Sequence, residues 1–307
     1  MRGVVIGTLT ELAEQDPRIV LLTADLGYCV LEQFADRVPG QFFNVGVSEQ
    51  NMLGLATGLA ESGFIPFVYS IVNFAALRPY EFIRNGPVLH QLPVRILAIG
   101  GGFEYGHAGP THHGLEDIGV MRVQPGLTVI APADAQQAKS ALKASYHLPG
   151  PVYFRLGKDD KTVLPGLEGK FDLGKAQEIR KGNDLLMVTM GSIAPSALEA
   201  INTLSEKGIS CGLMVVSCLS PAPKDDLVEI LARYPLVLTV EAHYIVGGVG
   251  SLVSEIIAEE GISCKVFRCG VRSTPNGITG SEKFLNDVNG LSSEKLVATA
   301  LQALGSF

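Results

Sequence analysis

Three short segments within the first 122 residues place ionisable and aromatic side chains where they could act on a small molecule. The first is FFNVGVSEQNMLGLATGLA, residues Phe42–Ala60. A strand ends near Gly46, Ser48 is placed to cap the helix that follows, and Glu49 lies in the first turn of that helix. The helix dipole by itself favours a carboxylate there. The pattern alone therefore leaves Glu49 as either a structural or a functional carboxyl group.

The second and third segments add an aromatic ring and two imidazoles. Pro66–Phe74 (PFVYSIVNF) ends in Phe74, which is either ordinary core or a platform on which a flat ring can stack. Gly109–Arg122 (GPTHHGLEDIGVMR) contains His112 and His113. A neutral imidazole suits hydrogen bonding and proton transfer near neutral pH. A histidine pair also occurs at metal sites, but no third ligand lies nearby in the sequence, so we expect no metal site.

Together the three segments resemble the pyrimidine-binding domain of transketolases and deoxyxylulose-phosphate synthases, which use thiamine diphosphate. The resemblance implies that Glu49 hydrogen-bonds N1′ of the cofactor's aminopyrimidine and drives it to the imino tautomer, which then removes the C2 proton of the thiazolium. It further implies that the Glu49 carboxyl is buried, that Phe74 stacks on the aminopyrimidine, and that His112 lines the substrate channel. Glu49 and His112 would then be the catalytic residues.

The same resemblance assigns further residues to the cofactor and the substrate. Asn73 and Ile71, in the segment that ends in the aromatic platform, join the cofactor-binding set. Asp25, in the segment TADL, either lines the cofactor cleft or ends its strand for structural reasons. His113 stands where many relatives have glutamine, and it joins His112 in the predicted substrate-binding set.

The predicted substrate channel departs from the family in several places. Ala108 stands where transketolases usually carry an aspartate that reads a substrate hydroxyl, and Cys29 where a serine helps to bind phosphate. Gly100–Gly102 replaces the histidine or arginine that helps to bind a sugar phosphate. Arg155 matches the family's phosphate arginine, which can grip a phosphate bidentately. We therefore expect an opened, glycine-lined channel and an acceptor other than an ordinary pentose or tetrose phosphate, such as a nucleotide-activated sugar.

The resemblance runs from about residue 3 to residue 305 but covers only about half of a full transketolase. The segment LTVEAHYIVGGVGS, residues 238–251, is similar to part of the C-terminal domain, which supports dimerisation. The other half of a transketolase binds magnesium and the diphosphate through a Gly-Asp-Gly motif that this sequence lacks. The resemblance therefore implies a partner chain that holds Mg2+ and an assembly of two copies of each chain. Structural or interface roles are expected for Glu116, Asp117, Arg122, Glu241 and His243.

Apolar runs alternate with helix-period stretches along the chain, which is typical of a mostly parallel sheet covered on both faces. We predict an α/β fold with two domains, residues 1–160 and 175–307, joined by a charged linker with proline and glycine at 161–174. The predicted strands are 18–23, 65–69, 94–99, 128–131, 151–154, 185–190, 212–216, 236–240 and 264–268. The predicted helices are 49–62, 75–89, 133–147, 192–207, 224–234, 248–260 and one from residue 293.

The composition limits the classes of function. The chain has 307 residues, 47% of them hydrophobic and 18% charged, enough to bury two cores. A net charge of -7 without a basic cluster argues against binding to nucleic acid or to a membrane surface. We expect neither a secretory signal nor a membrane-spanning segment. The five cysteines fit no zinc or redox spacing, so we expect buried free thiols and a cytoplasmic location.

The favoured interpretation is the C-terminal subunit of a split transketolase that transfers a two-carbon ketol unit between sugars. Three alternatives stay open: an acyloin-forming synthase that first decarboxylates a 2-oxoacid, the β-type subunit of a 2-oxoacid dehydrogenase, and a regulatory subunit that kept the fold without catalysis. The segment LEDIGVMR favours transketolase over dehydrogenase. The presence of Glu49, Phe74 and His112 together argues against a non-catalytic subunit.

Overall fold

The computed structural model describes residues 1–305 and builds the first half of the chain around a seven-stranded sheet. Neighbouring strands are parallel except at one edge, where β10 runs antiparallel to β5. Strand β1 is buried along its whole length, as expected for a sheet covered on both faces. In order across the sheet, the strands are β10 (Cys218–Ser220), β5 (Thr128–Ile130), β6 (Val152–Leu156), β4 (Arg95–Ile99), β3 (Ile65–Ile71), β1 (Ile19–Thr23) and β2 (Phe42–Asn44).

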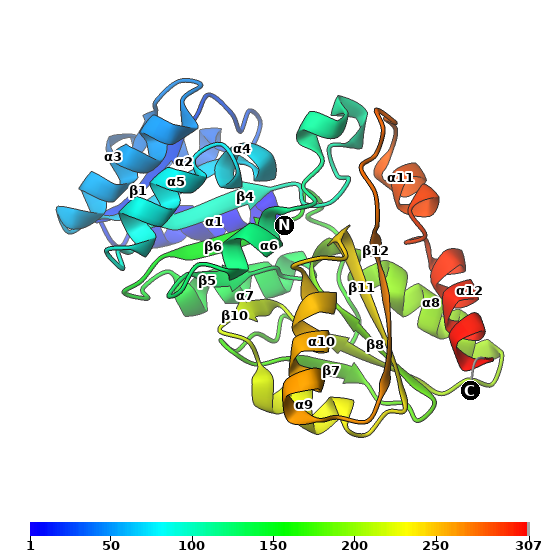
Figure 1. Ribbon diagram of the computed structural model, residues 1–307. Helices are drawn as coiled ribbons and strands as arrows, with labels where there is room; N and C mark the ends of the chain where they lie inside the picture. The colour runs from blue at the N-terminus through cyan, green and yellow to red at the C-terminus, as the bar shows by residue number, and fades with distance from the viewer. Residues whose placement is uncertain (306–307) are drawn as a thin grey trace.

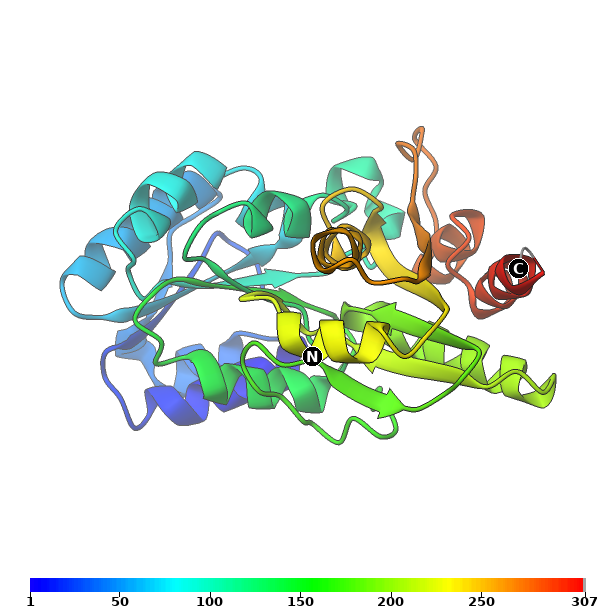
Figure 2. The same cartoon turned by 60° about the horizontal axis from the view of Figure 1, so that its bottom comes forward.

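Helices cover both faces of this sheet, so that it forms the middle of three layers (Figures 1 and 2). In Figure 2 the dark blue helices lie on one side of the sheet and the light blue and cyan helices on the other. Each helix layer packs its apolar side chains into a buried cluster against one sheet face. One layer consists of α1 (Arg2–Ala13), α2 (Glu32–Arg37) and α7 (Ala135–Ser145), and the other of α3 (Glu49–Glu61), α4 (Val72–Ala76), α5 (Tyr80–Ile83) and α6 (Asp117–Arg122).

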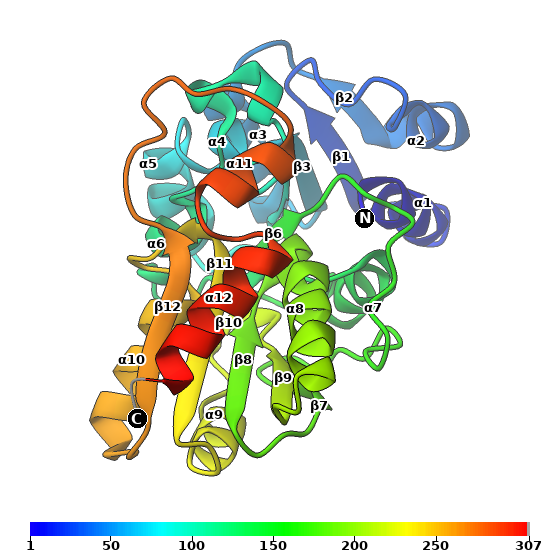
Figure 3. The same ribbon diagram turned by 90° about the vertical axis from the view of Figure 1, so that its right-hand side faces the viewer.

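The second half of the chain forms a five-stranded sheet, also between helices (Figures 1 and 3). Only the edge strand β7 is antiparallel to its neighbour. The strands, in order, are β12 (Lys265–Val271), β11 (Leu236–Tyr244), β8 (Leu185–Thr189), β9 (Cys211–Val215) and β7 (Gln177–Arg180). The helices are α8 (Ala194–Glu206), α11 (Glu282–Val288) and α12 (Ser293–Leu304) on one side, with α9 (Lys224–Leu231) and α10 (Val249–Glu260) on the other. Within residues 1–305, no helix combines the length and the apolarity needed to cross a bilayer.

The predicted α/β fold with mostly parallel sheets is confirmed, and each predicted strand has an observed counterpart. The prediction of a single helix over 75–89 is wrong. Helix α4 ends at Ala76, α5 spans Tyr80–Ile83, and a π-helical turn follows at Arg84–Val88. Pro79 and Pro87 explain the interruption, because proline lacks an N–H donor and disfavours helical backbone at the residue before it. All five cysteines are free thiols, as predicted, but the expected burial is wrong for two of them, because Cys29 is exposed and Cys264 is half-buried.

The two halves of the chain meet at a close junction around α6. Strand β10 comes from the second half of the sequence yet pairs with β5 of the first sheet. At a second contact, a methyl group on Gly247 would lie 2.7 Å from the Cα atom of Gly119, so the backbones can approach only because neither residue has a side chain. Arg122 donates to the carbonyl oxygen of Gly247 at 2.9 Å and pairs with Glu255 at 2.6 Å. The domain limits given above stay a prediction.

Buried charged groups lie at the centre of this junction. Asp117 and Arg155 are 1% and 4% exposed, and their ion pair is 3.1 Å long. Arg155 also donates to the carbonyl oxygen of Ala242 on β11 at 2.8 Å. Glu241 is fully buried beside it; the Gly250 N–H donates to its Oε1 at 3.0 Å, while Oε2 has no partner among the described residues. Burial raises the pKa of Glu241 to about 7.

Replacing Glu241 with glutamine should remove part of the pH dependence of folding stability. Burial raises the pKa of this acid from 4.5 to about 7 in the folded state, so the folded chain binds its proton more tightly than the unfolded chain. The unfolding free energy of the native chain should therefore fall, by about 3 kcal/mol for this group, as the pH rises from 4.5 to 7. Urea unfolding of the native chain and of Glu241→Gln across this range measures the difference.

The comparison isolates Glu241, because Glu282, whose pKa is also raised by burial to about 7, is present in both chains. Equal dependence on pH in the native chain and the variant would show that Glu241 does not titrate in this range.

Candidate functional site

The residues predicted to do chemistry gather at the carboxyl ends of the parallel strands in the first sheet. Ile71 ends β3, and Asn73 and Phe74 follow it in α4. The loop after β4 carries residues 100–113, and Glu49 begins α3 just after β2. Strands β4, β3, β1 and β2 are successive neighbours, so all these segments emerge along one edge of the sheet. This edge is where open α/β sheets bind ligands.

Glu49 is a buried carboxylate paired with an arginine. Its side chain is 1% exposed, and its Oε2 atom lies 2.5 Å from Nη1 of Arg78. Ser48 occupies the N-cap position of α3 but makes no side-chain hydrogen bond to the helix, so the predicted cap interaction is wrong. The structure thus contains the buried carboxyl expected at Glu49, together with a partner that sequence reasoning missed.

Arg78 also covers the aromatic ring that was expected to bind a cofactor. Its Cζ atom lies 4.4 Å from the centroid of the half-buried Phe74 ring. His112 meets the same ring edge-on, with centroids 5.1 Å apart and ring planes at 78°. Glu49, Arg78, Phe74 and His112 therefore form one continuous chain of contacts. The sequence did contain one signal that could have drawn attention to Arg78. Pro79 follows it, and a proline disfavours helical backbone at the residue before it.

His113 lies behind this set of residues. Its side chain is 2% exposed and packs edge-on against Phe103, with centroids 5.1 Å apart. Burial lowers the pKa of His113, which favours the neutral ring. Asn73 Nδ2 donates to the carbonyl oxygen of His113 at 2.8 Å, and Asn73 Oδ1 is buried without a partner among the described residues. The predicted substrate contact of His113 is therefore corrected to a supporting position in the core.

Asp25 and Ile71 lie at neighbouring strand ends. Asp25, after β1, has a left-handed backbone with φ 56°, and its Oδ1 accepts hydrogen bonds from the Tyr28 hydroxyl at 3.2 Å and from Asn44 Nδ2 at 2.9 Å. It lines a cavity of about 170 Å3 at the ends of β1 and β2. Ile71 is half-buried at the end of β3. Contact of either residue with a cofactor stays a prediction.

Arg155 is not the free phosphate-binding cation that was predicted. Its guanidinium is buried in the junction and committed to Asp117 and to backbone carbonyl oxygens. Turning it toward a phosphate would leave the Asp117 charge buried and unpaired, which is strongly unfavourable.

Lys158 lies three residues further, beyond the end of β6, with Nζ 4.4 Å from the centroid of the Tyr105 ring. Tyr105 in turn lies 6.5 Å from His112 between ring centroids. Lys158 was missed because it stands where the strand pattern gives way to linker composition.

The three glycines after β4 do not open a channel, contrary to the prediction. Side chains from neighbouring segments already occupy the space above Gly100–Gly102. A methyl group on the first glycine would lie 2.2 Å from Cε2 at the edge of the Tyr105 ring. One on the second would lie 2.4 Å from Nε of Arg155, and one on the third 2.7 Å from Cβ of Ala242. The glycines therefore allow close packing, and the room inferred for a bulky acceptor is filled.

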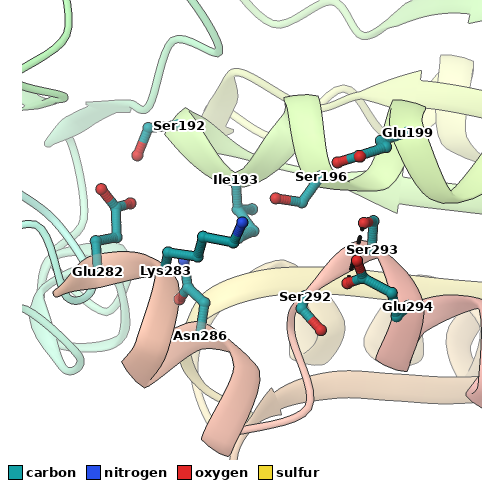
Figure 4. Close-up of a pocket in the computed structure, with 10 residues that line it drawn as sticks. All are labelled: Ser192, Ile193, Ser196, Glu199, Glu282, Lys283, Asn286, Ser292, Ser293 and Glu294. Atoms are coloured by element: carbon teal, nitrogen blue, oxygen red, sulfur yellow. Dashed lines mark hydrogen bonds between the residues drawn. The ribbon is translucent and has the colours of Figure 1, made fainter. Parts of the chain in front are cut away.

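A separate polar pocket of about 320 Å3 lies in the second half of the chain, between α11 and the first turns of α8 and α12 (Figure 4). Carboxylate, hydroxyl and amide groups line it, together with one lysine. The hydroxyl of Ser192 donates to Oε1 of Glu104, the residue before Tyr105, at 2.7 Å. The pocket therefore lies next to the loop after β4, through Ser192 and Glu104. None of the predicted site residues lines it.

Comparison with known protein families places this pair of α/β units in the transketolase class. Residues 1–162 match the pyrimidine binding domain of transketolase, and residues 174–295 match the transketolase C-terminal domain. The chain is 36% identical over 301 residues to a putative transketolase C-terminal section of Methanocaldococcus jannaschii, covering 97% of this chain and 94% of that protein. It is 34% identical over 297 residues to one of the subunits of the apulose-4-phosphate transketolase of Phocaeicola vulgatus, covering 96% and 94%. The chain belongs to the transketolase family.

Solved structures agree with this assignment. A protein described as a split gene transketolase, inactive beta4 tetramer, is 34% identical and superposes with a TM-score of 0.90, covering 99% of this chain and 98% of that one. A transketolase mutant from Pichia stipitis shares the fold with a TM-score of 0.83 at 19% identity, but this chain covers only 46% of it. The chain thus corresponds to the pyrimidine-binding and C-terminal half of a transketolase, as the sequence predicted.

The residues present fit one end of thiamine diphosphate. The Glu49 carboxyl, the unpaired Asn73 Oδ1 and the Phe74 ring offer two acceptors and an aromatic face, which complement a flat aminopyrimidine with N–H donors. The diphosphate end requires a metal held by oxygen ligands. Within residues 1–305, no group of three or more His, Cys, Asp or Glu side chains is placed to hold one.

A methyl group at Gly100 should destabilise the chain by more than backbone strain alone. Gly100→Ala must adopt a φ of +83° and also displace the Tyr105 ring, whereas Gly208→Ala adopts a φ of +80° with nothing within 4 Å. The Gly208 variant should lose about 1 kcal/mol of unfolding free energy, and the Gly100 variant at least about 2 kcal/mol. Urea denaturation of the two variants gives the comparison. Equal losses would mean that Tyr105 does not fill the space.

Proposed function

We propose that this chain is the C-terminal subunit of a two-chain transketolase that transfers a two-carbon ketol unit between sugars with thiamine diphosphate. The observation that carries the proposal is the Glu49 carboxyl, which is buried to 1% exposure at the ligand-binding edge of a transketolase-type sheet and connected to the Phe74 ring through Arg78. Removing a carboxylate from water is unfavourable. A function that requires a carboxyl group at this point accounts for its position.

The cofactor supplies the carbon centre that carries the two-carbon unit, and the protein supplies orientation and proton transfer. Glu49 would share a proton with a ring nitrogen of the aminopyrimidine, while Phe74 would stack against its face. Asn73 Oδ1 would accept an N–H hydrogen bond from the same ring. His112 Nδ1 lies 2.9 Å from the Thr111 hydroxyl, which leaves Nε2 to exchange a proton with a substrate hydroxyl.

The second half of the active site belongs to a partner chain in this proposal. The partner would hold Mg2+ and the diphosphate, because the described residues of this chain offer no such site. Two relatives support a division between chains, because one is named as a C-terminal section and the other as one subunit of its transketolase. We propose two copies of each chain in the assembly, with the cofactor bound between unlike subunits.

The substrates are proposed to be small anionic sugars outside the ordinary pentose series. One relative is named for apulose 4-phosphate, and another, from Clostridium sp. and 32% identical over 303 residues, is a subunit of a transketolase named for 6-deoxy-6-sulfo-D-fructose. Lys158, whose Nζ lies over the Tyr105 ring and donates to the Glu104 carbonyl oxygen at 3.0 Å, is the proposed cation for such a group. Because side chains fill the space above the glycines after β4, the structure gives no support for a nucleotide-activated acceptor.

Replacing Glu49 with glutamine should abolish most turnover of the assembled enzyme. The chain would be co-expressed with the N-terminal-half chain that co-purifies with it from its host, and two-carbon transfer would be followed by mass spectrometry over a panel of ketose phosphates and sulfonates. Glu49→Gln keeps the shape of the side chain but cannot share the proton in the same way, so the rate should fall by about a hundredfold or more. Glu81→Gln, on the exposed surface of α5, is the matched control and should keep the native rate.

Other outcomes separate the competing functions. Release of carbon dioxide from a 2-oxoacid, without ketol transfer, would favour an acyloin-forming synthase. A relative named as a synthase is the 1-deoxy-D-xylulose-5-phosphate synthase of Syntrophotalea carbinolica, 35% identical over 272 residues but matched over only 43% of its length. Native turnover by Glu49→Gln, or a native complex that binds no thiamine diphosphate, would overturn the catalytic proposal and favour a regulatory subunit.

A further inference from the structure

Arg78 makes two contacts at once, and both are contacts expected of the cofactor. Its Nη1 atom lies 2.5 Å from Glu49 Oε2, and its Cζ atom lies 4.4 Å from the centroid of the Phe74 ring. A guanidinium is flat, cationic and rich in N–H donors, and it stacks readily on aromatic rings. It therefore offers Glu49 and Phe74 the same two interactions as a flat ring with N–H groups.

The two partners differ greatly in exposure. The Glu49 side chain is 1% exposed, whereas that of Arg78 is 43% exposed. Because Arg78 reaches inward from the rim, it can leave toward solvent without disrupting the core. Glu49 has no such freedom, because its carboxyl group is fixed at the start of α3. If Arg78 leaves, this buried carboxyl group needs another hydrogen-bond donor.

The backbone around Arg78 suits such a movement. Helix α4 ends at Ala76 and α5 begins at Tyr80, so Arg78 lies in a break between two short helices. Pro79 prevents these helices from merging. The Arg78 side chain is therefore held by Glu49 and Phe74 and not by a continuous helix.

We propose that Arg78 is a placeholder for the cofactor's aminopyrimidine: in the cofactor-free chain it neutralises Glu49 and covers Phe74, and it must leave both before the cofactor can bind. This inference rests on the proposed function, because it takes the cofactor site to be the one formed by Glu49 and Phe74. Arg78 is then a positioning residue that opposes cofactor binding while it stabilises the empty site.

Removing Arg78 should strengthen cofactor binding. The cofactor-free complex with the N-terminal-half partner would be titrated with thiamine diphosphate and Mg2+ in a calorimeter, for the native chain and for Arg78→Ala. Losing an ion pair and a cation–π contact from the empty state should lower the dissociation constant by about fivefold or more. Arg78→Lys, which keeps the charge without the flat face, should lie between the two. Arg84→Ala, which removes an exposed arginine that contacts Asn85 instead, should bind like the native chain.

A second measurement separates a placeholder from a merely structural residue. Arg78→Ala should lower the thermal unfolding midpoint of the cofactor-free chain, because Glu49 loses its partner, but not that of the complex saturated with cofactor. A structural residue would lower both midpoints.

Two further results overturn the inference or its basis. An unchanged or weaker affinity in Arg78→Ala, with normal binding by the native complex, overturns the placeholder while the proposed function stands. No cofactor binding by either the native complex or the variant overturns both. Binding by the variant alone would show that Arg78 blocks the site, and it would support the placeholder and the cofactor site together.

Discussion

The site depends on one constraint, which is that a carboxyl group removed from water must keep a hydrogen-bonding partner. The start of α3 delivers Glu49 to the edge of the sheet, where its side chain is 1% exposed. Arg78 is the partner of this carboxyl group. It lies in a segment that two prolines prevent from forming one continuous helix. The contacts from Arg78 to Phe74 and from Phe74 to His112 then order the rest of the site around the buried carboxyl.

The same requirement explains how the two halves of the chain are held together. Arg155 and Asp117 pair in the core, and Arg155 also donates to a carbonyl oxygen of β11 in the second sheet. The loop after β4 packs over this pair, and its glycines let Tyr105 and Arg155 approach the backbone closely. The position of His112 at the end of that loop is thus coupled to the junction between the two halves. Tyr105 and Arg155 occupy the space that a family-based interpretation left empty.

Sequence reasoning succeeded where the signal was local. The buried strands follow from continuous apolar runs, and the burial of Glu49 was implied by a short motif at a strand–helix boundary. It failed where an outcome depended on contacts between distant segments. Arg155 lies within β6 and is buried, whereas Lys158 lies beyond the end of this strand. The sequence does not show where β6 ends relative to the edge of the sheet, so it could not tell which of the two cations is available to a ligand. The partner of Glu49 comes from 29 residues away and could not be read from the motif.

The chemistry of the two cofactor ends gives a physical reason for the two chains of the proposed enzyme. This chain offers acceptors and an aromatic face, which suit an aminopyrimidine. Among residues 1–305, the cation paired with Glu49 is the arginine that is proposed to leave. A diphosphate is commonly held through a metal ion with oxygen ligands, and within residues 1–305 no group of three or more His, Cys, Asp or Glu side chains is placed to hold one. In the proposed enzyme, each half-site alone would lack some of the interactions that order the whole cofactor. In the proposed enzyme, affinity for the cofactor is a property of the interface, and the ion pair between Glu49 and Arg78 keeps this half stable until the interface and the cofactor are both present.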